Sequence, residues 1–422
     1  MTAPKIQAPR GTYDVLPEQA GGRADLETTA RRILESAGYR RIETPAFEAT
    51  ELFARGVGES TDIVQKEMYT FDDGGGRSIT LRPEGTAPVC RAYVEHGMHK
   101  LPQPVRLWYL SSFFRYERAQ AGRYREFWQV GVEALGSDDP AVDAEAIVLL
   151  HALLEELRVR GTRLRLSSLG TPDTRAAYRE RLQAHLRAHA DELSEDVRSR
   201  IDLNPLRAFD SEHPGTRRVT ATAPRLLDEL AADDAEHFAA VRALLDAADV
   251  PYEIDPTLVR GLDYYTRTVF ELTSDALGAQ SGVGGGGRYD GLVEQLGGPP
   301  TPGVGWAAGI ERMLLAAEPR PAPEPVVDLY VAYEGPALRE QAFATVVEAR
   351  RAGISAQLEL AGRSLKGQLR QAGRLEAGFV AILRPDGMEL KDSQTGEQEA
   401  VEGPTAVVAR VLRGRHGMGA GL

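Results

Sequence analysis

The sequence contains one cysteine, Cys90, among its 422 residues. A single thiol cannot form an internal disulfide or a metal site built from several cysteines, so we expect Cys90 to be a small core residue. No stretch approaches the roughly 18–20 consecutive apolar residues of a membrane-spanning helix. The N-terminal MTAPKIQAPRG also lacks the apolar centre of a secretory signal. These absences favour a cytoplasmic protein without a membrane segment.

The sequence also lacks the excess of basic residues that is typical of nucleic-acid-binding proteins. Its formal net charge is −12 at pH 7. The region from Pro325 onward carries equal numbers of acidic and basic residues, so the whole negative excess lies before it. Any RNA binding would therefore depend on local basic patches rather than on the field of the whole protein.

The length of the chain and a proline-rich stretch within it predict two or three domains. Residues 319–325 contain four prolines, which is typical of a stiff linker. After it, residues 326–422 alternate strand and helix patterns and predict a small, mostly parallel sheet flanked by helices. Residues 171–248 are rich in Ala, Arg, Leu and Glu and predict a helical insertion. It would divide the main domain into residues 1–170 and 249–320.

The most informative stretch is Phe113–Glu133, which reads FFRYERAQAGRYREFWQVGVE. It predicts two strands joined by a turn at residues 118–122. Because side chains alternate along a strand, one face of the second strand carries Arg123, Arg125, Phe127, Gln129 and Glu133. Arg115 and Glu117 share a face of the first strand. Guanidinium groups bind phosphate oxygens bidentately and an aromatic ring stacks on a purine, so a polyanion site is favoured over an exposed, salt-bridged hairpin.

This hairpin resembles motif 2 of class II aminoacyl-tRNA synthetases, and its spacing is similar to that of the histidyl-tRNA synthetase family. The resemblance implies that Arg115 holds the α-phosphate of ATP and Arg123 the γ-phosphate. It implies that Phe127 stacks on adenine. A divalent metal, Mg²⁺, is also implied, and Glu117 is a candidate contact for it.

A second stretch, Leu258–Glu271, reads LVRGLDYYTRTVFE and resembles a signature of histidyl-tRNA synthetases and their close paralogues. An ordinary edge strand would not account for a permanently charged arginine beside a flexible glycine at Arg260-Gly261. The resemblance implies that Arg260 contacts the α-phosphate and the substrate carboxylate, which makes Arg260 and Arg115 the catalytic arginines. It also assigns Tyr264 and Tyr265 to the histidine site, with Tyr265 bonded to the imidazole.

The glycine-rich run Gly282–Gly291 contains GxGxxG, the fingerprint of dinucleotide-binding folds. That interpretation requires a preceding strand, and residues 274–281 do not predict one. The run instead resembles the second histidine-specific motif of the family, in which Tyr289 lines the substrate pocket. We therefore reject a dinucleotide site.

Two further segments are similar to the remaining class II motifs. A helix from about Arg23, followed by a strand that closes on Pro45, resembles motif 1, the dimer element. Gly303–Leu314 resembles motif 3, and the resemblance implies that Arg312 contacts the γ-phosphate.

The turn at Arg82–Thr86 brings a carboxylate to the start of a helix, where acidic residues often serve as caps. The resemblance implies that Glu84 and Thr86, with Gln129, bind the α-amino group of the substrate. It places the imidazole between Glu133 and Tyr265. A pocket that pairs both ring nitrogens rejects apolar analogues, because its own polar groups would be left unpaired.

The resemblance covers nearly the whole chain and implies an α/β protein of the class II type. We expect an antiparallel sheet flanked by helices, the helical insertion, and a C-terminal mixed α/β anticodon-binding domain. The implied activity is histidine–tRNA ligation: L-histidine reacts with ATP to give histidyl-adenylate and pyrophosphate, and histidine is transferred to the 3′ end of tRNA(His). A homodimer is implied as well.

Two features depart from the family pattern, and two other functions remain as alternatives. Trp128 stands where the family often has histidine, and residues 119–121 differ from the usual turn, which leaves the contacts to the tRNA acceptor end open. The main alternative is a non-catalytic, histidine-sensing regulatory paralogue of ATP phosphoribosyltransferase. Such proteins usually lack the C-terminal domain and the arginines, whereas Arg115, Arg260 and Arg312 are all present here. A general RNA-binding module would not need two histidine-specific motifs.

Overall fold

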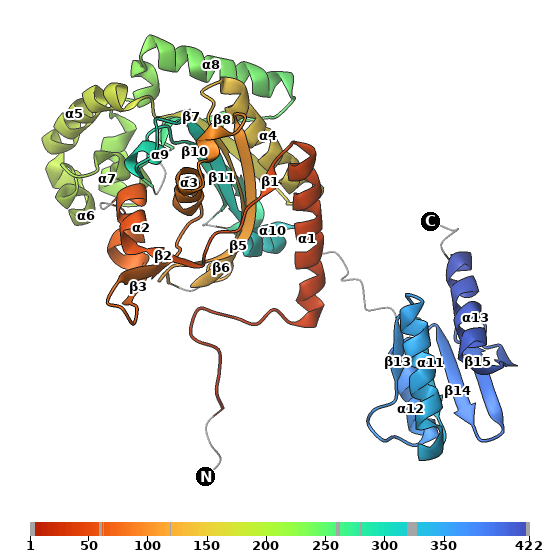
Figure 1. Cartoon of the computed structure of the whole chain (residues 1–422). Helices are drawn as coiled ribbons and strands as arrows, with labels where there is room; N and C mark the ends of the chain where they lie inside the picture. Colours follow the sequence, from red (N-terminus) through yellow and green to blue (C-terminus); the bar gives the residue numbers. More distant parts are fainter. Residues whose placement is uncertain are drawn as a thin grey trace. The chain divides into compact units, whose positions relative to one another are not determined.

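A mixed sheet forms the centre of the first of two units into which the chain folds, residues 1–320 and 321–422 (Figure 1). The computed structural model describes residues 5–58, 61, 63–118, 120–258, 262–278, 281–318 and 327–418. Within this part of the first unit the sheet has eight strands, and only its edge strands β1 and β8 pair in parallel. In spatial order the strands are β1 (Arg40–Arg41), β5 (Val105–Phe114), β6 (Glu126–Leu135), β11 (Gly303–Gly309), β10 (Gly282–Arg288), β9 (Thr266–Ser274), β7 (Thr162–Ser168) and β8 (Glu253–Ile254).

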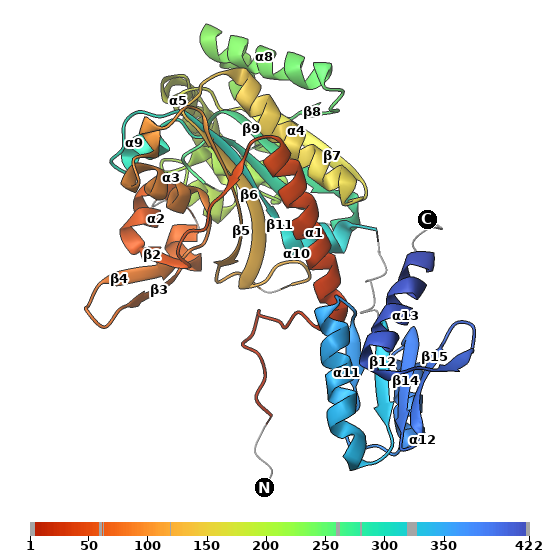
Figure 2. The same cartoon turned by 45° about the vertical axis from the view of Figure 1, so that its right-hand side comes forward.

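Long helices cover one face of this sheet (Figure 2). They are α1 (Pro17–Ser36), α4 (Pro140–Glu156), α8 (Ala232–Ala247) and the shorter α10 (Ile310–Ala316). The strands supply alternate residues to this core, for example Trp108 and Leu110 of β5, which belong to one buried cluster with Leu26 of α1. Burial of these apolar side chains is the main force that holds the helices on the sheet.

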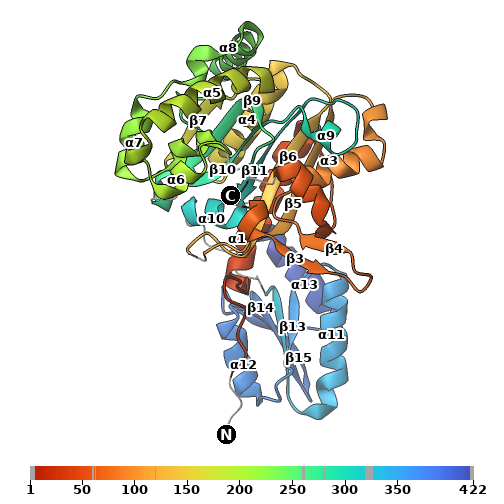
Figure 3. The ribbon, with the colours of Figure 1, turned by 90° about the vertical axis from the view of Figure 1, so that its left-hand side faces the viewer.

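A second set of helices packs on the opposite side, which is also the side of the candidate site (Figure 3). Leu107 and Tyr109, which alternate with Trp108 and Leu110, belong to the second buried cluster. The covering helices are α3 (Thr86–Glu95), α9 (Leu292–Gln295), α5 (Pro172–Ala188), α6 (Glu195–Ser199) and α7 (Pro214–Ala221). The first unit also contains short helical turns: η2 (Met98–Lys100), η3 (Ala190–Glu192), η4 (Pro205–Asp210), η5 (Leu226–Glu229) and, between β9 and β10, η6 (Asp275–Leu277).

A small antiparallel sheet with the order β2-β4-β3 precedes α3 in the sequence. Its strands are β2 (Phe47–Ala49), β4 (Ser78–Leu81) and β3 (Tyr69–Asp72), with α2 (Thr50–Val57) and η1 (Ile63–Glu67) between the first strand and the hairpin. The hairpin of β3 and β4 leads directly into the turn that carries Glu84.

The second unit is a mixed sheet with the order β13-β12-β14-β15-β16. Two of its four strand pairings are parallel and two are antiparallel, so the sheet is mixed rather than mostly parallel as the sequence predicted. The strands are β12 (Leu329–Tyr333), β13 (Ala356–Leu358), β14 (Phe379–Arg384), β15 (Gly387–Asp392) and β16 (Gln398–Ala400); the helical segments are η7 (Pro336–Leu338), α11 (Arg339–Arg351), α12 (Leu365–Arg374) and α13 (Gly403–Met418). Apolar residues of β12, β14 and α11 form its core.

The predicted α/β class with a helix-flanked sheet is confirmed, while several element boundaries differ. The helix predicted from about Arg23 begins at Pro17, because proline suits the first helical position. Arg115 and Glu117, predicted on the first strand of the hairpin, lie beyond it: β5 ends at Phe114, since the Tyr116 amide donates to the Glu67 carbonyl (2.7 Å) instead of continuing the ladder. Arg123 and Arg125, predicted on the second strand, precede β6, which begins at Glu126. The glycine-rich run forms the central strand β10, not the turn and helix of a dinucleotide fold.

Candidate active site

A cavity of about 230 Å³ opens over the ends of β6, β10 and β11. Its lining includes five residues that the sequence singled out, namely Arg115, Glu117, Arg123, Phe127 and Arg312. The strand register explains part of this gathering. Phe127 pairs directly with Phe113, so its ring lies on the same face of the sheet as Gln129 and Glu133 further along β6.

The arginines of the hairpin are held in place beside this cavity. The Nε of Arg115 donates to the Pro83 carbonyl (2.8 Å), and its guanidinium carbon lies 5.3 Å from the centre of the Phe127 ring. Glu117 stands between the two arginines, 3.7 Å from Arg115 and 3.3 Å from Arg123. One carboxylate thus faces two guanidinium groups, which leaves positive charge for an anionic ligand.

Arg312 enters the cavity from α10, next to the hairpin turn at Gly122. Its Nε donates to the Gly282 carbonyl, which fixes the side chain against β10. Burial and the neighbouring charge of Arg123 lower the pKa of Arg312. Two neighbouring guanidinium groups form a site that a bound polyphosphate would stabilise, because its negative charge offsets their repulsion. Arg260, the fourth predicted arginine, lies outside the described residues.

Glu311 forms the floor of the cavity, a role that the sequence did not predict. Its carboxylate accepts hydrogen bonds from the Trp128 amide (3.1 and 3.2 Å) and from the Tyr13 hydroxyl (2.9 Å), and it pairs with Arg23 (2.5 Å). Glu311, the residue before Arg312, therefore ties the N-terminal segment and α1 to β6. The contact joins residues almost 300 positions apart, so no local pattern signals it.

Glu133 lies at the other end of the site and is completely buried. Its carboxylate accepts hydrogen bonds from the hydroxyl groups of Thr86 (2.8 Å), Tyr289 (2.5 Å) and Tyr109 (3.4 Å). Glu133, Thr86 and Tyr289 were predicted as site residues from the sequence, and Tyr109 was not. Tyr109 faces Gly131 across the strand pair, and an aromatic residue opposite a glycine is a signal only once the register is known.

Glycines provide the space in which this carboxylate and its tyrosines lie. A Cβ on Gly305 would lie 2.0 Å from Oε2 of Glu133, and one on Gly303 would lie 2.3 Å from the Tyr289 ring. A Cβ on Gly131 would lie 2.4 Å from Tyr109. The glycines of β6 and β11 are therefore required because neighbouring side chains lie too close for a Cβ, and not because of their backbone conformation.

Glu84 and Thr86 approach Glu133 from the start of α3. Glu84 is buried, and its two oxygens accept from the amides of Thr86 (2.7 Å) and Ala87 (3.0 Å). Glu84 thus caps the helix, as an acidic residue at a helix start commonly does. Each oxygen retains a second acceptor site, so capping does not prevent Glu84 from binding an ammonium group as well.

Three tyrosines and Gln129 complete the surroundings of Glu133. The ring centres of Tyr264 and Tyr265 lie 4.7 Å apart, and those of Tyr264 and Tyr289 lie 5.8 Å apart. The Oε1 of Gln129 is buried and has no hydrogen-bond partner within the described part of the chain. Because buried acceptors are normally paired, this oxygen is suited to accept from a bound ligand.

Burial raises the pKa of Glu133 from 4.5 to about 8, although its hydroxyl partners act against this shift. A group whose pKa is raised in the folded state stabilises the fold at low pH and loses that contribution as the pH rises. We therefore expect the wild type to lose stability relative to Glu133→Gln between about pH 4.5 and pH 8, on the order of 1 kcal/mol per pH unit. Urea unfolding of both proteins across this range tests the expectation, and a pH-independent difference would contradict it.

The described residues contain no group of three or more His, Cys, Asp or Glu side chains that could hold a metal ion alone. The cavity lining includes three carboxylates, Glu117, Glu271 and Glu311. Glu311 is already engaged by Arg23, the Tyr13 hydroxyl and the Trp128 amide, so Glu117 and Glu271 are the candidates for a metal. Mg²⁺ is commonly bound by one or two carboxylates together with substrate phosphates and water, and this donor set fits that pattern. The sequence did not single out Glu271.

Among the described helices, none combines the length and the apolar character that crossing a membrane requires.

Comparison with known proteins identifies the family. The model of the histidyl-tRNA synthetase family matches residues 11–313, more than half of the chain. The chain belongs to the histidyl-tRNA synthetase family. A histidine–tRNA ligase of Desulforamulus reducens is 48% identical over 401 residues, which cover 93% of this chain and 96% of that protein. One from Halorhodospira halophila is 51% identical over 388 residues and 90% of each protein.

A solved structure agrees with this assignment. The apo histidyl-tRNA synthetase of S. aureus matches with a TM-score of 0.80 at 37% identity, covering 96% of this chain and 100% of that one. The match extends over both units of this histidyl-tRNA synthetase family member, including the part after residue 320 that the family model does not reach.

Proposed function

We propose that this chain is a histidine–tRNA ligase, which joins L-histidine to the 3′ end of tRNA(His) in two steps. First, a carboxylate oxygen of histidine attacks the α-phosphorus of ATP, which forms histidyl-adenylate and releases pyrophosphate. Then a terminal ribose hydroxyl of the tRNA attacks the activated carbonyl and releases AMP. The observation that carries the proposal is the arrangement along one sheet face. An arginine-lined cavity and a buried, hydroxyl-bonded carboxylate lie at the two ends of β6.

The cavity takes ATP. Phe127 stacks on adenine, Arg115 binds the α-phosphate, and Arg123 and Arg312 bind the γ-phosphate. Support comes from the lining of the cavity, which brings these four side chains together from β6, its preceding turn and α10. Fixed cations serve this chemistry because nucleotidyl transfer depends on positioning and on the stabilisation of phosphate charge. When bound with ATP, Mg²⁺ would be held by Glu117 and Glu271 and would neutralise phosphate charge.

The buried end of the site takes histidine. Glu84, Thr86 and Gln129 bind the α-amino group, and the orphan oxygen of Gln129 supports this role. Glu133 and Tyr265 pair with the imidazole, while Tyr264 and Tyr289 form the walls of the pocket. Arg260 neutralises the substrate carboxylate and the α-phosphate during attack. Because the donors and acceptors are fixed before the substrate enters, little reorganisation opposes the reaction.

The assembly and the domain roles are part of the same proposal. The enzyme acts as a homodimer, residues 171–248 form an insertion in the catalytic domain, and residues 326–422 form the anticodon-binding domain. The separation of the chain into two compact units supports a distinct role for the second. A cytoplasmic location stays a prediction.

Aminoacylation tests the full reaction. Purified protein with ATP, Mg²⁺ and labelled histidine is expected to charge a tRNA(His) transcript and not a transcript of another identity. Removal of Mg²⁺ by a chelator is expected to abolish charging. Equal charging of both transcripts, or of neither, would contradict the proposal.

A further inference from the structure

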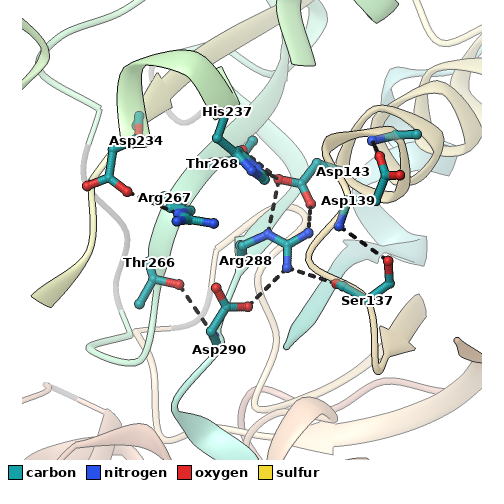
Figure 4. A network of polar contacts seen from close by, with 12 residues as sticks. Ser137, Asp139, Asp143, Asp234, His237, Thr266, Arg267, Thr268, Arg288 and Asp290 are labelled. Atoms are coloured by element: carbon teal, nitrogen blue, oxygen red, sulfur yellow. Dashed lines mark hydrogen bonds and ion pairs between the residues drawn. The ribbon is translucent and has the colours of Figure 1, made fainter. Parts of the chain in front are cut away.

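Figure 4 shows a completely buried ion pair between α4 and the end of β10. Helix α4 packs on the face of the sheet opposite the proposed histidine pocket. Asp143 of α4 and Arg288, the last residue of β10, are both 0% exposed and make a two-pronged contact. Asp143 also accepts from His237 of α8 (2.8 Å) and from the Thr268 hydroxyl of β9 (2.6 Å). The mechanism proposed above uses none of these residues.

All the contacts of Asp143 suit an ionised carboxylate. Burial raises the pKa of Asp143, but the hydrogen bonds from His237 and the charge of Arg288 outweigh it and hold the pKa below its usual value. Asp143 lies in the first turn of α4, where the helix dipole also favours negative charge. Because an ionised carboxylate only accepts hydrogen bonds, Nε2 of His237 carries the proton in this contact.

The guanidinium of Arg288 fixes the chain at the end of β10. Its Nη1 donates to the Ser137 carbonyl (3.0 Å) and to Asp290 (3.0 Å). The same oxygen of Asp290 accepts from the Gly303 amide (3.2 Å). Residues 288–290 are therefore held on both sides, by α4 through Arg288 and by β11 through Asp290.

Tyr289 lies in the middle of this turn and faces the opposite way. Successive side chains along extended backbone point to opposite faces of a sheet. While Arg288 points towards α4 and α8, the hydroxyl of Tyr289 donates to Glu133 at 2.5 Å. The Tyr289 amide donates to the Gly303 carbonyl (2.7 Å). The ion pair on one face thus holds the residue that contacts the histidine-recognising carboxylate on the other.

A purely stabilising role is the simplest alternative, but it does not explain the chemistry of the pair. Buried ion pairs contribute little net stability, because desolvation offsets their attraction, and apolar residues of similar volume often replace them without loss. A bidentate arginine fork does supply a fixed direction, which an apolar contact does not.

We propose that Asp143 is a positioning residue for the histidine pocket, which acts through Arg288 to fix the turn at residues 288–290 and so aims Tyr289 at Glu133. His237 and Thr268 hold the carboxylate of Asp143 in its orientation. The inference rests on the proposed function for the identity of the ligand, L-histidine.

A double-mutant cycle separates positioning from general stabilisation. The equilibrium binding of L-histidine is measured by calorimetry for the wild type, Asp143→Asn, Tyr289→Phe and the double variant. We expect each single variant to weaken binding by about 5- to 10-fold, which corresponds to roughly 1 kcal/mol. We expect the double variant to bind as weakly as Tyr289→Phe alone, because Asp143 acts through the hydroxyl that this variant has already lost.

The control is Glu359→Gln in the second unit. Glu359 is also buried (1% exposed) and also accepts from a tyrosine hydroxyl, that of Tyr330 (2.9 Å). It is expected to leave histidine binding within about twofold of the wild type, because it shares no described contact with the residues of the proposed pocket. If Asp143→Asn does not fold, Thr268→Val replaces it in the cycle, because this variant keeps the ion pair and removes one hydroxyl donor to Asp143.

Multiplicative effects in the double variant, or unchanged histidine binding in a folded Asp143→Asn or Thr268→Val protein, would overturn the inference. Histidine-dependent exchange of pyrophosphate into ATP is measured on the wild type in parallel. Histidine binding without exchange would overturn the proposed function, and the binding cycle would still decide the role of Asp143. A wild type that binds no histidine would overturn both.

Discussion

Replacing Glu133 with alanine is expected to lower kcat/KM for histidine activation by at least about 100-fold, while ATP binding changes less than about twofold. The change removes the acceptor of three buried hydroxyl groups, those of Thr86, Tyr289 and Tyr109. Buried donors without a partner cost about 1–3 kcal/mol each, and the imidazole would lose its own partner too. The measurement is histidine-dependent pyrophosphate exchange, together with equilibrium binding of ATP.

The matched control is Glu145→Ala. Glu145 lies on α4, where it contacts Arg106 (3.1 Å) and Tyr39 (3.3 Å). It therefore lies outside both ends of the site, and we expect activation of histidine to stay close to that of the wild type. Unchanged activation in Glu133→Ala, or an equal loss of ATP binding, would refute the assignment of Glu133 to the imidazole.

Replacing Arg115 with alanine is expected to lower kcat for adenylate formation by about 10²–10³-fold, the effect of removing one fixed donor from a developing negative charge. Arg115→Lys is expected to recover only part of this loss, because an ammonium group lacks the planar fork that binds two phosphate oxygens. Single-turnover formation of histidyl-adenylate is the measurement, since it separates the chemical step from product release.

Arg91→Ala is the matched control for this change. The side chains of Arg91 and Arg115 are similarly exposed, at 25% and 21%. Arg91, however, pairs with Glu95 of α3 and with Glu48 of β2. Its loss is expected to leave the single-turnover rate within about twofold, because Arg91 does not line the cavity. A rate for Arg115→Ala equal to that of Arg91→Ala would exclude Arg115 from the chemical step.

The alternation of residues along β6 could be read from the sequence, and it placed Phe127, Gln129 and Glu133 on one face correctly. The period of two is a local property, so it does not depend on the rest of the chain. The length of the first strand was predicted less well, since β5 ends where the Tyr116 amide finds the Glu67 carbonyl. That partner belongs to a different segment, and local propensity carries no information about it.

The contacts that complete the site depend on tertiary structure and were missed for that reason. Tyr109 reaches Glu133 only because the register sets it opposite Gly131. Glu311 meets Tyr13 and Trp128 only after the N-terminal segment, β6 and α10 have come together. The glycine-rich run also shows the limits of a motif: its glycines serve the close packing of a central strand, and the literal GxGxxG has no meaning in that setting. The roles assigned to Arg115, Arg123, Arg312 and the histidine-site residues came from family resemblance and stay predictions.

The central claim is that one sheet face binds ATP and histidine together and joins them. The most direct test is amino-acid-dependent ATP–pyrophosphate exchange with purified protein, no tRNA, and each of the twenty amino acids in turn. We expect exchange with histidine alone. Histidine binding without exchange would contradict it and would favour the histidine-sensing regulatory protein, in which the arginines of the cavity no longer serve catalysis.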